Sequence, residues 1–193
     1  MTKGRESDMP EEELWTTFFD PDAVLTAVGL TGVVRDAVDF GCGYGTFTIP
    51  AARRVKGTVY ALDIEPEMIA ATRAKARAAN LTNVVARQRH FFGEGTGLEP
   101  QSVDYAMLFN ILHAEEPLHL LREAWRILRP GGRVGVIHWN YDPNTPRGPS
   151  LTIRPRPADC RRWIEEAGFI LVNDIIDLPP YHYGLCGRKG EDK

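Results

Sequence analysis

Short apolar runs alternate with longer amphipathic segments along most of the chain. Apolar runs of strand length lie at 34–40, 58–63, 84–90, 103–109 and 133–139. Segments with the apolar spacing of helices lie between them, at 46–55, 66–80 and 116–128. This alternation predicts an α/β fold with a doubly wound, mostly parallel sheet and helices on both faces.

The N-terminal part carries helix signals ahead of the first apolar run. Residues 11–19 are expected to form one helix. Asp20 and Pro21 are residue types that cap and begin a helix, so a second helix is expected from there to about Gly29.

The C-terminal part departs from the parallel pattern. A long loop with many prolines at 140–157 is followed by an expected helix at 158–167 and strands at 169–176 and 181–186. The linker 178–180 is too short for a parallel crossover, so the last strand pair is expected to be antiparallel.

Composition narrows the class of protein. The chain has 193 residues, of which 43% are hydrophobic, so we expect a single domain over 1–193. Within it, 1–33 form an N-terminal tail and helices, and 34–193 form the sheet core. The first residues are polar, so no secretory signal is expected. No run of about 20 apolar residues occurs, so no membrane span is expected.

Charge and cysteine content exclude other classes. The net charge of −3 and the absence of a basic stripe argue against a nucleic-acid partner. Five arginines between 147 and 162 are interpreted as a solvated loop and helix start. Cys42, Cys160 and Cys186 have neither disulfide-framework nor metal-ligand spacing, so no metal and a cytoplasmic location are expected. Oligomeric state is left open.

The strongest motif follows the first predicted strand. Asp39-Phe40-Gly41-Cys42-Gly43-Tyr44-Gly45 connects a buried strand to a helix, where glycines allow a sharp turn and close approach of a ligand to the backbone. A dinucleotide loop places its third glycine where Thr46 stands here. The carboxylate of Asp39 is badly placed beside a pyrophosphate and well placed for a cationic amino group.

A second acid supports a nucleoside ligand. Asp63 ends the next predicted strand, near the spacing at which a carboxylate accepts hydrogen bonds from ribose hydroxyls in such folds. Ile64 and Met68 lie beside it and are candidates to pack against an adenine ring. An aspartate at a strand end is also a common helix cap, so Asp63 indicates a ribose-binding role only in combination with the glycine loop.

These motifs resemble the class I S-adenosylmethionine-dependent methyltransferases, especially the small type 11 branch, which have a Rossmann-like fold. Ser102-Val103-Asp104-Tyr105 resembles the family's entry to the fourth strand, and Leu128-Arg129-Pro130-Gly131-Gly132 its turn before the fifth. The resemblance implies S-adenosylmethionine as cofactor. It assigns the methionine part to the loop (Asp39, Gly41, Cys42, Gly43, Tyr44 and Gly45) and the ribose to Asp63.

One segment departs from the family pattern. The family usually has an acid after the third strand that contacts the adenine amino group, whereas His90 or Phe91 stands at that position here. Adenine is therefore expected to be held by the backbone or by Phe91 and Phe92.

Candidate catalytic residues follow the fourth and fifth strands, whose carboxyl ends face the cofactor crevice in this architecture. Asn110 is expected near the methyl donor, His138 is the first candidate for a general base, and His113 is the second. A strand-end or helix-start histidine without a catalytic role is the alternative for either. Trp15, Phe18 and Phe19 are expected either as a lid or, preferably, as the buried face of the first helix.

The sequence thus favours an enzyme that methylates a small-molecule acceptor, bound by the N-terminal helices, the loop 140–157 and the final hairpin. A non-catalytic S-adenosylmethionine-binding interaction module is the alternative, and a nicotinamide-dependent oxidoreductase is disfavoured by the glycine spacing. An arsenite-type methyltransferase is disfavoured because nothing places the three thiols together.

Overall fold

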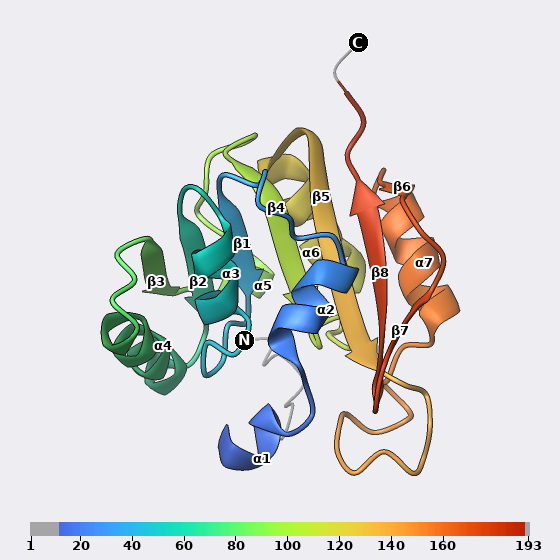
Figure 1. Ribbon diagram of the computed structural model, residues 1–193. Coiled ribbons are helices and arrows are strands. Elements are labelled where there is room, and N and C mark those ends of the chain that lie inside the picture. The colour runs from blue at the N-terminus through green and yellow to red at the C-terminus, as the bar shows by residue number, and fades with distance from the viewer. Residues whose placement is uncertain (1–11, 192–193) are drawn as a thin grey trace.

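The computed structural model describes residues 12–191, which form a layered α/β structure around one mixed sheet (Figure 1). Its strands follow the order β3-β2-β1-β4-β5-β8-β6, with β7 paired to β8. The strands are β1 (Ala37–Phe40), β2 (Val59–Asp63), β3 (Val84–Gln88), β4 (Val103–Phe109), β5 (Leu128–Trp139), β6 (Ile170–Leu171), β7 (Ile176–Leu178) and β8 (His182–Arg188).

The pairing confirms the predicted topology. Strands β1 to β5 are paired in parallel. Strand β8 is antiparallel to β5, β6 and β7. The predicted strand 169–176 was wrong as one element, because it divides into β6 and β7 around the polar residues Asn173 and Asp174.

Helices cover both faces of the sheet. They are α1 (Glu12–Thr16), α2 (Pro21–Ala27), α3 (Thr48–Arg54), α4 (Pro66–Ala78), α5 (Phe91–Glu94), α6 (Pro117–Ile127) and α7 (Pro157–Glu166). In Figure 1, α2 and α3 lie in front of the sheet and α6 lies behind it. None of the described helices has the length and apolar character needed to cross a membrane.

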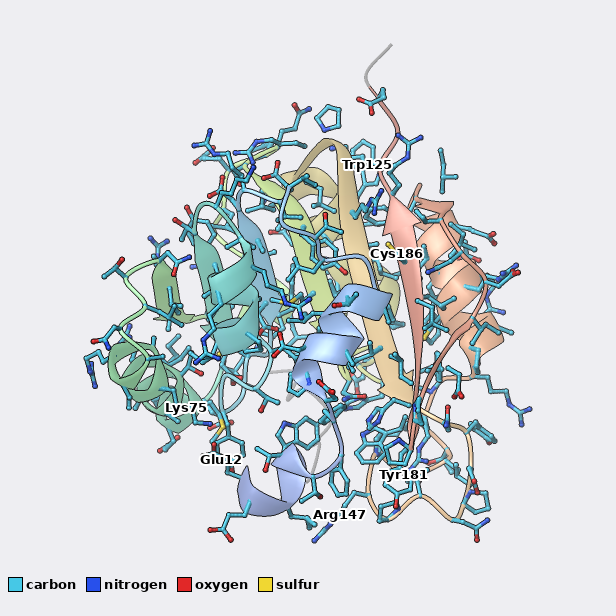
Figure 2. The ribbon with its side chains drawn as sticks, viewed as in Figure 1. Glu12, Lys75, Trp125, Arg147, Tyr181 and Cys186 are labelled. Carbon is cyan, nitrogen blue, oxygen red and sulfur yellow. The ribbon has the colours of Figure 1, made fainter. Side chains whose placement is uncertain are left out.

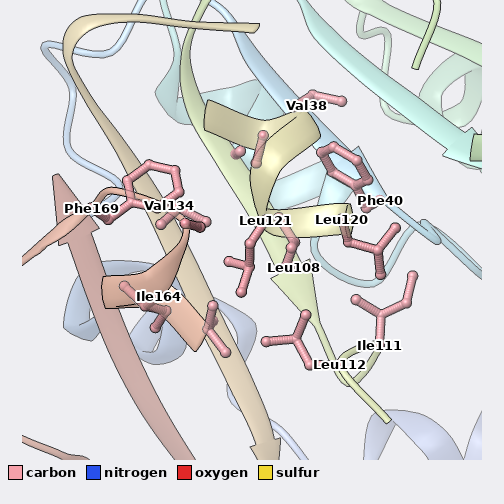
Figure 3. Packing of buried hydrophobic residues seen from close by; sticks show 14 of the residues in the cluster. Val38, Phe40, Leu108, Ile111, Leu112, Leu120, Leu121, Val134, Ile164 and Phe169 are labelled. Atoms are coloured by element: carbon pink, nitrogen blue, oxygen red, sulfur yellow. The ribbon is translucent and has the colours of Figure 1, made fainter. Parts of the chain in front are cut away.

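Each face of the sheet has its own apolar core. Residues Leu108 and Val134 point from the strands toward α6 and α7, where they pack with Leu121 and Ile164 (Figure 3). The opposite face packs against α2 and α3. Because both faces are covered, the central parallel strands β1 and β4 are buried along nearly their full length, whereas the edge strand β3 is only partly buried.

Local signals explain most element boundaries. Asp20 caps α2 by accepting a hydrogen bond from Ala23 N at 3.0 Å, as the sequence predicted. Helix α3 begins two residues later than expected. Strand β5 begins five residues earlier, because Leu128 already pairs with Val103 before a register shift. The four-residue helix α5 was not predicted.

Candidate cofactor and active site

The glycine loop between β1 and α3 has a left-handed backbone at each of its glycines. The φ angles are +74° at Gly41, +52° at Gly43 and +78° at Gly45. A Cβ atom at Gly45 would stand 3.0 Å from the Thr72 hydroxyl, so both conformation and space require glycine there. The N–H groups of Gly41 and Cys42 donate to Leu62 O at 2.8 and 2.9 Å, which fixes the loop to β2.

Two buried aspartates flank this loop. Asp39 is 3% exposed and accepts a hydrogen bond from the Thr48 hydroxyl at 2.6 Å. Asp63 is 7% exposed and accepts from Gly43 N at 2.8 Å and from Glu65 N at 3.0 Å. Since each carboxylate oxygen has two lone pairs, both groups keep capacity to bind a ligand.

The electrostatics of the pair favour a positively charged ligand. Burial raises the pKa of Asp39 to about 7, opposed by the Thr48 hydrogen bond and reinforced by the charge of Asp63. Burial also raises the pKa of Asp63, against the backbone N–H groups that lower it. No basic side chain in the described part of the chain is among the groups that shift either pKa. A bound cation would therefore stabilise both ionised carboxylates.

Asn110 directly follows β4 and has a left-handed backbone, with φ +54°. Both its amide oxygen and its amide nitrogen are buried, and no hydrogen-bond partner is found for either. Buried polar atoms without partners are rare in folded proteins, and a bound ligand is one cause. This amide lies at the carboxyl edge of the sheet, where the crevice of a doubly wound fold forms.

The remaining predicted cofactor residues differ in exposure. Tyr44, Ile64 and Met68 are half-buried, whereas Cys42 is buried and its pKa is raised by burial, so it is not a reactive thiol. Phe91 is 1% exposed and packs edge-on against Phe40 at 5.7 Å between ring centroids. Its ring is therefore in the core, whereas Phe92 is half-buried, so the backbone or Phe92 stays the predicted adenine contact.

The two candidate bases lie together. His113 and His138 are 6% and 0% exposed, and His113 Nδ1 lies 3.4 Å from His138 Nε2. His138 Nδ1 is buried, and no described residue is a hydrogen-bond partner for it. Burial and then the nearby charges of His113, His182 and Arg154 hold the pKa of His138 well below its usual value, so the ring is neutral at neutral pH.

Two residues near this edge were not among the candidate site residues. His182, at the start of β8, is 1% exposed and has no partner for either ring nitrogen. Arg154 was interpreted as solvated, which was wrong. It is 7% exposed and donates to the carbonyl oxygens of Asn140, Asp142, Arg147 and Pro149, so it organises the loop 140–157.

The aromatic residues of the N-terminal segment cover the carboxyl end of β5. Phe18 is 4% exposed, and its ring centroid lies 5.2 Å from that of Trp139. Helix α1 has no buried residues, so the preferred expectation of a buried first-helix face was wrong. Figure 2 shows Tyr181, Glu12 and Lys75 toward this same end of the sheet.

The described residues contain no group of three or more histidine, cysteine or acidic side chains able to hold a metal ion. The cysteines at 42, 160 and 186 are buried and free. This arrangement gives no support to the arsenite-type alternative.

Comparisons with known proteins agree with the geometry. A family model described as a methyltransferase domain matches residues 37–132. The chain is 37% identical over 109 residues to nocamycin O-methyltransferase from Saccharothrix syringae, covering 52% of this chain and 36% of that protein. It is 29% identical over 113 residues to demethylmenaquinone methyltransferase from Lactobacillus johnsonii, covering 56% and 45%. The chain thus spans less than half the length of these curated relatives.

A solved structure covers more of the fold. The crystal structure of an S-adenosylmethionine-dependent methyltransferase from Aquifex aeolicus superposes with a TM-score of 0.79 at 25% identity, covering 92% of this chain and 93% of that one. The chain belongs to the class I S-adenosylmethionine-dependent methyltransferases, in the type 11 branch, and its cofactor is S-adenosylmethionine.

The residues present fit this cofactor. Its methionine part carries a cationic amino group and a sulfonium, which match two buried carboxylates without basic partners. Its ribose needs a hydrogen-bond acceptor such as Asp63, and the unpartnered Asn110 amide offers both a donor and an acceptor. The left-handed glycines leave the backbone open to close approach.

Proposed function

We propose that the chain transfers the methyl group of S-adenosylmethionine to a small-molecule acceptor bound at the carboxyl ends of β4 and β5 and the amino end of β8. The observation that carries this proposal is the pair of buried carboxylates around a left-handed glycine loop. The names of the two relatives above, an O-methyltransferase and a demethylmenaquinone methyltransferase, support a small acceptor.

The cofactor residues have separate roles in this proposal. Asp39 binds the cationic amino group, and Asp63 binds the ribose hydroxyls while it holds Gly43 N. The buried amide of Asn110 forms its hydrogen bonds with the methionine part of the cofactor. Ile64 and Met68 pack against the adenine ring. When bound, the cofactor supplies an electrophilic methyl group on a sulfonium, so the protein contributes alignment and exclusion of water.

His138 is proposed as the general base for an acceptor that arrives protonated. When His138 Nε2 carries the proton and donates it to His113 Nδ1, the Nδ1 atom of His138 keeps a free lone pair. His113 is the positioning residue that fixes this tautomer. The low pKa of His138 keeps that lone pair available at neutral pH.

The proposal extends to the organisation of the protein. We propose one domain over 1–193, a small-molecule partner and no nucleic-acid or membrane partner, in line with the net charge of −3. A cytoplasmic location stays a prediction.

The test measures S-adenosylhomocysteine release from S-adenosylmethionine over a panel of small acceptors. Turnover by the wild type and loss of about 10²-fold or more in kcat with His138→Gln, at unchanged cofactor affinity, is the expected result. His119→Gln is the matched control, because His119 is exposed on α6. Cofactor binding without turnover on any acceptor would favour the interaction module instead. Binding of NAD in a thermal-shift assay would instead support a nicotinamide-dependent oxidoreductase.

A further inference from the structure

Trp139 is the point where the three segments expected to bind the acceptor meet. Its ring lies 5.2 Å from that of Phe18 in the N-terminal segment and 6.3 Å from that of Tyr181 before β8. In the loop 140–157, a Cβ atom at Gly148 would stand 2.8 Å from Trp139 Cγ. Aromatic surface therefore dominates this end of the sheet.

His182 places an unsatisfied polar group inside this aromatic surround. Its ring lies 4.2 Å from that of Trp139 and 4.4 Å from that of Phe19. Both ring nitrogens are buried, and neither has a hydrogen-bond partner among residues 12–191. A buried imidazole with no partner costs free energy that the fold recovers only when a ligand supplies hydrogen bonds.

Phe19 connects this histidine to the cofactor loop. Its ring also lies 5.1 Å from that of Phe47, which stands two residues after the last loop glycine. Helix α1, which precedes Phe19, has no buried residue, and Phe19 itself is half-buried, whereas Phe18 is buried against Trp139 and anchors the segment. A planar ring that replaced Phe19 would lie between His182 and the cofactor loop.

A positive charge acts on the same place. Arg154 is buried, and its hydrogen bonds go to backbone carbonyls and the Thr145 hydroxyl. In the described part of the chain no carboxylate accepts a hydrogen bond from it, although the charge of Asp142 acts on it. Burial, followed by the charge of Arg154, lowers the pKa of His182 to about 3. The imidazole is therefore neutral, and the local field favours an anionic or ionisable group beside it.

We propose that the acceptor is a planar aromatic compound with an ionisable ring hydroxyl, which takes the place of the Phe19 ring and hydrogen-bonds to His182. This inference rests on the proposed function, since it names the substrate class of that same site. The hydroxyl serves to recognise the acceptor, and the atom that receives the methyl group can be a different one. His182 then determines specificity, because its hydrogen bond rejects aromatic rings without the hydroxyl.

The test uses 4-nitrophenol as probe, with nitrobenzene as the analogue that lacks the hydroxyl, on protein saturated with S-adenosylhomocysteine. Calorimetry on the wild type is expected to show 4-nitrophenol binding about tenfold or more tightly than nitrobenzene. The absorbance titration of bound 4-nitrophenol is expected to show a lowered pKa, because Arg154 favours the anion. His182→Phe keeps the ring and is expected to remove the preference, whereas Phe19→Ala is expected to strengthen 4-nitrophenol binding.

His119→Phe on the exposed face of α6 is the matched control and is expected to change neither ligand. Absence of 4-nitrophenol binding at millimolar concentration, equal affinity for nitrobenzene, or a preference retained in His182→Phe would each overturn the inference. Weaker binding in Phe19→Ala would overturn the placement of the ring. Affinity for S-adenosylhomocysteine, measured first in each variant, separates these outcomes from failure of the cofactor site.

Discussion

Replacing Asp39 by asparagine separates the stability of the free protein from its ability to bind the cofactor. The substitution keeps the size of the side chain and an acceptor for the Thr48 hydroxyl, and removes the buried negative charge. Burial raises the pKa of Asp39 from 3.8 to about 7, so the folded state binds this proton more tightly than the unfolded chain does. The associated stability is fully present below the unfolded pKa and is lost as pH rises through the folded one.

The magnitude follows from the shift. Three pKa units correspond to about 4 kcal/mol, an order-of-magnitude cost of keeping Asp39 ionised in the free protein at about pH 8. If asparagine recovers half of it, about 2 kcal/mol, the melting temperature rises by about 4–8 °C for a chain of this size. At about pH 5, where folded Asp39 is already protonated, the difference is expected to shrink sharply.

Differential scanning calorimetry at the two pH values, with and without S-adenosylhomocysteine, measures both effects. We expect Asp39→Asn to melt higher than the wild type in the free state at the higher pH and to gain little from added ligand. Asp177→Asn, at an exposed carboxylate on β7, is a matched control expected to change neither response by much. Equal melting temperatures at about pH 8, or a difference as large at about pH 5 as at about pH 8, would refute the reasoning.

Three further predictions concern the same edge of the sheet. Cofactor affinity is expected to rise from about pH 6 to about pH 8 as Asp39 ionises, with proton release in calorimetry, and a flat profile would contradict this. Gly45→Ala, at φ +78° and against Thr72, is expected to lower unfolding free energy by about 1–3 kcal/mol in denaturant titration. Arg154→Met is expected to accelerate amide exchange across the loop 140–157 without weakening cofactor binding, and unchanged exchange would argue against its role there.

The parts of the fold that follow local rules could be predicted from the sequence. Strand β4 was predicted with its observed bounds, because six of its seven residues, all except Asp104, are suited to burial on both faces of a parallel sheet. The start of α2 was also predictable, since the Asp20 cap is a contact between residues three apart in sequence. The early start of β5 was not, because it depends on the pairing of Leu128 with Val103.

Some residues of the candidate site could likewise be predicted from the sequence, and others could not. The aspartates at 39 and 63 stand at strand ends beside a glycine motif, so their spacing in the sequence was enough to predict them as cofactor residues. His182 was missed as a polar group of the site because its burial depends on the antiparallel register that sets it beside Trp139. Arg154 was misinterpreted because its partners are backbone carbonyls spread over the loop, which leave no pattern in the sequence.

A crystal structure with S-adenosylhomocysteine bound tests the central claim most directly. The account predicts that the ligand's amino group lies within hydrogen-bond distance of the Asp39 carboxylate or the Asn110 amide, and that both ribose hydroxyls contact Asp63. Binding of the ligand away from the glycine loop 41–45, or a ribose with no contact to Asp63, would contradict it.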